Sequence, residues 1–160
     1  MKKLLLLIPF ALLLCGCNRN AALMPFLGKW SGHFEVTDLT NGGTAADIKR
    51  ETLSGYVQVY ATQRSYKMEL QGEQETISIT GFWTIKGNRI TLNPKTVSID
   101  DQGGAELRDP NKKFIPAADV HAAYGRPLVL AETTNNKALD GLKMSVGNLI
   151  GTHHFVKDSF

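Results

Sequence analysis

The sequence predicts an all-β domain of eight to nine antiparallel strands that close, or nearly close, into a barrel, with one short helix or long loop insertion. Apolar and polar residues alternate over many short runs, as they do when the two faces of a strand meet core and solvent. Turn-like sequences separate these runs at short spacing, which favours a closed sheet. One longer stretch, residues 105–125, breaks this spacing and indicates the insertion.

The first strand illustrates the alternation. In LGKWSGHFEV, Trp30 and Phe34 fall on one face and His33 falls on the other. The same period-two pattern recurs along the chain. The predicted strands are 27–36, 55–61, 65–71, 76–85, 89–93, 95–100, 127–133, 142–146 and 148–157.

Glycine, asparagine and proline mark the predicted turns. Gly87-Asn88 fits a two-residue hairpin turn because both residues tolerate positive φ. Pro94 is expected to end the strand that follows this hairpin, because proline cannot donate to a strand ladder.

Two stretches depart from the strand pattern. Residues 44–53 fit a short helix capped by Thr44, with Asp47 three residues on, or the front of the strand that contains Tyr56. In PAADVHAAYG, Pro116 at the first helical position and Gly125 just past the end predict one short helix. We expect this insertion to cover a mouth or an edge of the barrel.

Residues 1–16 are predicted to be a cleaved signal peptide. Lys2 and Lys3 precede the apolar run Leu4 to Leu14, which is shorter than the about 20 residues that span a bilayer. A retained membrane helix, a disulfide between the two cysteines, and a C-x-C metal pair are the competing interpretations. The short run and the adjacent cleavage site argue against all three.

Leu14-Cys15-Gly16-Cys17 resembles the lipobox of bacterial lipoproteins. Gly16 is small enough to precede the cleaved bond. The resemblance implies cleavage between Gly16 and Cys17, a thioether-linked diacylglycerol on Cys17, and acylation of the new amino terminus. Several acyl chains, each stabilised by roughly 0.8 kcal/mol per buried methylene, make attachment effectively permanent.

The lipobox resemblance also implies the domain boundaries and the cellular location. Residues 17–25 would form a lipidated tether, and residues 26–160 the barrel domain. By resemblance to enterobacterial sorting rules, Asn18 after the cysteine implies the outer membrane, with the domain facing the periplasm. The membrane is therefore an expected partner through the anchor.

The charge of the domain argues against nucleic acid as a partner. The formal net charge is +3, and it falls to about +1 without Lys2 and Lys3 of the leader. Phosphate binding needs clustered lysine and arginine, which a near-neutral body does not supply.

Two further motifs resemble one known family. GKW, from Gly28 to Trp30, resembles the G-x-W signature of lipocalins and wider calycins. Residues 81–92 resemble the G-x-W-x-x-x-G-x-x-I-x-L hairpin of small bacterial lipocalin-like lipoproteins. The resemblance implies an eight-stranded barrel whose tryptophan plugs the closed end, with a basic residue of the last strand, here Lys157, packed across it. A curved open sheet and a sandwich are the alternative folds.

The sequence shows no constellation for catalysis, a metal or a cofactor, so we expect no enzyme. It contains no G-x-S-x-G elbow and no dinucleotide fingerprint. His33 meets His153 or His154 only if the first and last strands pair. His153 and His154 are adjacent and therefore point to opposite faces of a strand. Half-exposed strand histidines are expected rather than a metal site. Residues 100–106, which include Asp100, Asp101 and Glu106, are expected to form a solvated turn rather than a calcium loop.

Two functions fit these expectations. The first is a non-enzymatic binding module for a small hydrophobic ligand or envelope component, because the interior of an eight-stranded barrel is either filled or holds one small ligand. The second is an envelope protein-interaction or stress lipoprotein that acts through loops such as Lys112 to Gly125, as an inhibitor, immunity factor or assembly accessory.

Overall fold

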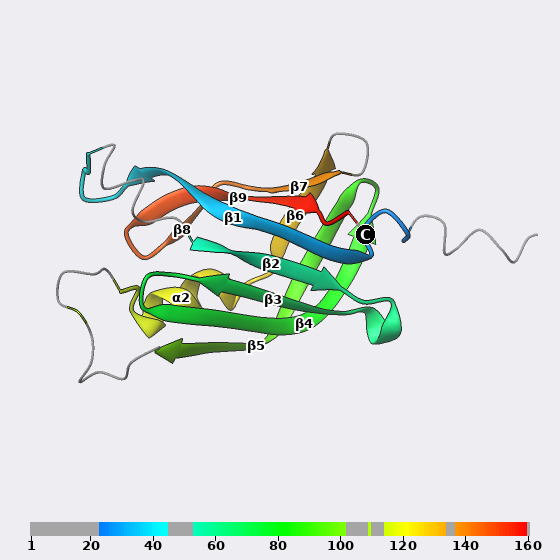
Figure 1. Ribbon diagram of the computed structural model, residues 1–160, viewed down its shortest axis with the longest axis horizontal. Coiled ribbons are helices and arrows are strands. Elements are labelled where there is room, and N and C mark those ends of the chain that lie inside the picture. Colours follow the sequence, from blue (N-terminus) through cyan, green and yellow to red (C-terminus); the bar gives the residue numbers. More distant parts are fainter. Residues whose placement is uncertain (1–22, 45–52, 102–108, 110–113, 134–136, 160) are drawn as a thin grey trace, which may run out of the picture.

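The protein folds into one antiparallel β-barrel (Figure 1). A computed structural model describes residues 23–44, 53–101, 109, 114–133 and 137–159. Its strands are β1 (Gly28–Leu39), β2 (Leu53–Val59), β3 (Ser65–Gln71), β4 (Glu75–Lys86), β5 (Arg89–Asp101), β6 (Leu128–Thr133), β7 (Ala138–Gly141), β8 (Met144–Val146) and β9 (Leu149–Lys157). Its helices are the 3-10 turn η2 (Thr62–Arg64) and α2 (Ala117–Tyr124). Neither described helix is long and apolar enough to cross a membrane.

The pairing of β1 with β9 closes the barrel. The strand order is β1-β2-β3-β4-β5-β6-β7-β9-β8, and β1 pairs with β9 from Trp30 opposite Lys157 to Leu39 opposite Leu149. β7 and β8 pair one after the other with the same strand, β9. Together they act as one interrupted strand, so the wall has eight strand positions. The predicted closed antiparallel barrel is therefore confirmed.

Helix α2 lies where the wall divides. β5 pairs with β4 along its whole length but with β6 only from Arg89 to Leu92. α2 packs against β5 and β8, on the two sides of this division (Figure 1). Its Val120 and Tyr124 are buried, so the helix contributes to the core. The predicted short helix is confirmed, with its start one residue later than expected, since Pro116 precedes its first residue and Gly125 follows its last.

Two strand predictions need correction. β5 continues through Pro94 because β6 stops pairing at Leu92 and the β4 register shifts between Thr80 and Gly81, opposite the proline. A proline at such an edge and bulge removes no ladder hydrogen bond. β7 was not expected, because its four residues are too few to show alternation. Of residues 44–53, only Thr44 and Leu53 are described, and Leu53 begins β2.

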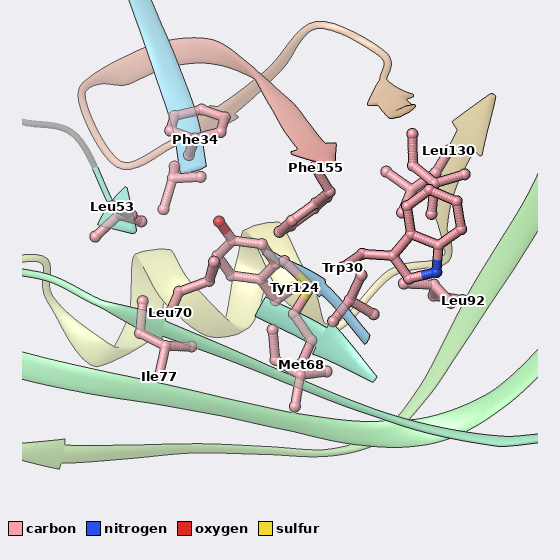
Figure 2. Close-up of a cluster of buried hydrophobic side chains, with 14 of the residues drawn as sticks. Trp30, Phe34, Leu53, Met68, Leu70, Ile77, Leu92, Tyr124, Leu130 and Phe155 are labelled. Carbon is pink, nitrogen blue, oxygen red and sulfur yellow. The ribbon is translucent and has the colours of Figure 1, made fainter. Parts of the chain in front are cut away.

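Large side chains fill the interior of the barrel. Alternate residues of every long strand point inward, and Tyr124 enters from α2 (Figure 2). Burying each large apolar side chain contributes about 1.5–3 kcal/mol. The largest fully buried side chains are Trp30, Trp83, Phe34, Phe155, Met68, Leu70, Ile77, Ile90, Leu92, Leu130, Leu139 and Leu149.

Candidate binding site

A groove lies on the flank of the barrel beside α2, and we call it the α2 groove. It encloses about 380 Å³ between the end of α2, the start of β6 and the break between β7 and β8. Its lining residues are Ala122, Ala123, Arg126, Pro127, Leu128, Val129, Leu142, Lys143, Met144 and Ser145.

Local sequence explains why this groove remains open. α2 presents the small side chains of Ala122 and Ala123 to it, and the helix ends at Gly125 before the chain turns into β6. The interruption between β7 and β8 leaves Leu142 outside the core, with 63% of its surface exposed. An exposed leucine beside half-buried Met144 gives the groove an apolar wall.

Two cations complete the groove. Arg126 and Lys143 both line it and both are exposed, and none of its described lining residues carries a carboxylate. An apolar wall with two cations and no carboxylate among its lining residues suits a molecule that has a hydrophobic part and one negative group.

A buried polar pair links α2 to the barrel wall. His153 is fully buried, and its Nε2 lies 3.2 Å from the hydroxyl of Tyr124. Its ring stacks on Phe155 at 5.4 Å and lies 5.0 Å from Phe34. Desolvation by burial, and then the nearby His33, lower the pKa of His153 to about 3. The expectation of a half-exposed histidine is therefore wrong for His153, which faces inward with Phe155.

The outward histidines form a separate cluster on the barrel wall. His33 and His154 face each other across β1 and β9, with ring centroids 6.0 Å apart. His154 Nδ1 is hydrogen-bonded to Asp140, whose other oxygen accepts from Thr133 Oγ1 at 3.1 Å. In the described part of the chain, no three histidine, cysteine or acidic side chains are arranged to hold a metal ion.

An acidic pair lies at the end of β4 and β5. Glu75 is buried, with 2% of its surface exposed, opposite Asp101. Desolvation raises the pKa of Glu75, while backbone N–H groups of Ile115 and Gln74 partly offset this by donating to its carboxylate. Asp100 and Asp101 end β5 rather than forming a free turn, and residues 102–108 lie outside the described part of the chain.

The predicted barrel-closing residues meet at one end, which we call the closed end. Trp30 is fully buried, and its Nε1 donates to the carbonyl of Phe26 at 3.0 Å. Lys157 Nζ lies 5.1 Å from the Trp30 ring centroid and donates to the carbonyl of Pro25 at 2.9 Å. Gly28 starts β1 with φ of 113°, a conformation that glycine adopts readily. The predicted cleavage and lipidation residues, Gly16 and Cys17, lie outside the described residues.

Sequence reasoning did not identify the α2 groove. Its lining comes from three segments that only the tertiary fold brings together, so no local motif marks it. The one usable signal was the apolar Leu142 beside Lys143, at a break in the strand pattern. Neither a protein-family model nor a curated protein sequence matches this chain.

Proposed function

We propose that this protein is a lipid-anchored, non-enzymatic binding module of the bacterial envelope that holds a small amphiphile with one acidic head group. The leader 1–16 is removed, Cys17 carries the lipid, and the domain faces the periplasm from the outer membrane. The ligand lies in the α2 groove, with its apolar part against Leu142 and Met144.

The composition of the α2 groove is the observation that carries this proposal. A volume of about 380 Å³ falls in the range of small-molecule sites. Arg126 and Lys143 supply the charge for a carboxylate or phosphate. The filled barrel interior favours a ligand held on the flank rather than between the strands.

Thermal unfolding of the acylated protein with saturated fatty acids and their methyl esters tests the proposal. A ligand at 100 times its dissociation constant stabilises the folded state by about 2.7 kcal/mol. We expect the acids to raise Tm and the esters, which lack the negative charge, to raise it much less.

Matched variants locate the bound ligand. Arg126→Gln combined with Lys143→Gln is expected to abolish the preference for acids over esters. Ala123→Trp fills the α2 groove and is expected to weaken binding of both. Lys95→Gln, on the exposed surface of β5, serves as the charge control. A Tm that no fatty acid raises, or a preference that survives the double substitution, would refute ligand binding at this groove.

A second function, protein interaction near α2, is favoured by the exposure of Leu142. At 63% exposure, this leucine is one of the most exposed large apolar side chains among the described residues. A photo-crosslinking amino acid at position 142 in intact cells should trap one specific envelope protein, whereas the same group at Thr37 on β1 should not. Identical crosslinking patterns at the two positions would remove this alternative.

A further inference from the structure

The described residues at the two ends of the barrel differ in charge. At the closed end, the described segments 23–30, 59–66, 82–91, 131–133, 137–139 and 156–159 contain six cationic side chains: Lys29, Arg64, Lys86, Arg89, Lys137 and Lys157. The same segments contain two carboxylates, Glu132 and Asp158. Three of the cations have contacts within the domain. Lys29 lies 3.9 Å from Asp158, Lys157 packs on Trp30, and Arg64 lies 5.9 Å from the Trp83 ring centroid.

The described residues at the opposite end are acidic. Its described segments, 37–44, 71–76, 98–101, 114–121 and 145–150, contain no lysine or arginine. The carboxylates there, together with residue 109 beside the β3–β4 turn, are Asp38, Glu73, Glu75, Asp100, Asp101, Asp109 and Asp119. An anionic surface would therefore attract the closed end and repel the carboxylates described at the opposite end.

The closed end also exposes large apolar side chains. Met24 is 64% exposed, Tyr60 44% and Phe82 47%. Tyr60 donates its backbone N–H to Ser65, and Ser65 lies opposite Phe82, so the two aromatic residues flank Ser65 on the outer face of β2, β3 and β4. Aromatic side chains at the edge of a basic surface are typical of contact with a membrane interface.

The chain enters the domain at the same end. Phe26 donates its backbone N–H to the carbonyl of Leu23, and Lys157 holds Pro25, so the entry point is fixed (Figure 1). Only residues 18–22 separate Cys17 from Leu23, and this stretch reaches at most roughly 20 Å when fully extended. A lipid at Cys17 would therefore keep the closed end near the bilayer.

We propose that the closed end docks on an anionic phospholipid bilayer, an inference that rests on the proposed lipidation of Cys17. Met24, Tyr60 and Phe82 enter the head-group layer, while Arg64 and Lys86, with Arg89 and Lys137, contact lipid phosphates. The acidic end and α2 then point away from the membrane, which leaves α2 accessible from the periplasm.

Depth-dependent quenching of the acylated full-length protein tests this orientation. Intact mass first establishes the acyl chains on the purified protein. Because Cys17 is then blocked, Thr62→Cys in η2 and Thr40→Cys after β1 each accept one fluorescent label. The proteins are reconstituted in vesicles of phosphatidylethanolamine and phosphatidylglycerol that contain spin-labelled lipid. We expect strong quenching at position 62 and little at position 40.

Charge variants show whether the cations set the orientation. Replacing Arg64, Lys86 and Arg89 by glutamine should lower the docked-to-free ratio by about 100-fold, since each cation near an anionic surface contributes roughly a factor of five. In vesicles of phosphatidylcholine, which carry no net charge, the difference in quenching between the two labels should also decrease. Replacing Lys95 by glutamine, on β5 away from the closed end and from the α2 groove, should leave the difference in quenching unchanged.

The outcomes separate the two proposals. A protein without acyl chains would overturn the proposed lipidation. An acylated protein whose two labels are quenched equally, or whose contrast survives loss of the three closed-end cations, would overturn the docking inference and leave the lipidation intact.

Discussion

The buried His153 predicts that the domain loses stability as the pH falls. Burial lowers the pKa of its imidazole to about 3 in the folded protein, from an ordinary value of 6.5. Between pH values of about 3 and 6.5, this imidazole therefore binds a proton in the unfolded chain but not in the folded chain. Because the pKa is lowered by folding, stability is unaffected above about pH 6.5 and decreases as the pH falls toward 3.

The two pKa values give the size of this effect. Between about pH 7.5 and about pH 5, proton binding by the unfolded imidazole should lower the free energy of unfolding by about 2 kcal/mol. The buried Glu75 acts in the opposite direction, because its raised pKa makes protonation favour the folded state. The pH dependence of the unfolding free energy therefore has to be compared between the parent and a His153 variant, because the parent alone combines both groups.

Urea unfolding at a series of pH values measures the effect. His153→Phe keeps an aromatic ring beside Phe155 but cannot titrate, and it leaves the Tyr124 hydroxyl without its partner. We expect it to be less stable than the parent at pH 7.5 and to lose about 2 kcal/mol less on acidification. His121→Asn, at an exposed position of α2, is the control and should retain the parent slope. An unchanged slope in His153→Phe would refute the reasoning.

Three further substitutions test the polar contacts. Glu75→Gln should steepen the loss of stability on acidification, because a glutamine cannot take up the proton that favours the folded state in the parent. An unchanged pH dependence of Tm would show that Glu75 does not contribute. Lys157→Met should lower the free energy of unfolding in urea by about 1–2 kcal/mol, because it removes the hydrogen bond to Pro25 and the contact with the Trp30 ring. An unchanged urea midpoint would show that the lysine is dispensable. Tyr124→Phe should cost about 1 kcal/mol, measured in the same way, by removing the hydroxyl that meets His153; no loss would mean that this hydrogen bond adds nothing net.

The wall of the barrel could be predicted because its signals are local. Alternation around Trp30 and Phe34 placed β1, and both residues are buried. Gly87-Asn88 marked the β4–β5 hairpin, and Gly87 has φ of 62°. Pro116 and Gly125 marked the limits of α2. Each signal depends on the backbone preference of one or two residues, which the sequence shows directly.

The sites could not be predicted in the same way because they depend on which strands become neighbours. The continuity of β5 through Pro94 follows from where β6 stops pairing, which no local pattern records. The α2 groove likewise needs three separate segments. The sequence does contain a signal for the burial of His153, because this residue shares the period-two face of Leu149 and Phe155. The expectation that it is half-exposed rested on the polarity of histidine instead of on this pattern.

The β1–β9 seam has a consequence for how the chain acquires its structure. The bond from Lys157 to Pro25 joins residues 132 positions apart, and the whole seam is equally non-local. Such contacts form only after a large entropic cost of loop closure, so folding should be slow compared with that of helical proteins of this size. Because β1 has β2 alone as its other neighbour, a growing polypeptide that still lacks β9 holds an unclosed curved sheet. Synthesis of the last strand would therefore be complete before the tryptophan at its base is sealed from water.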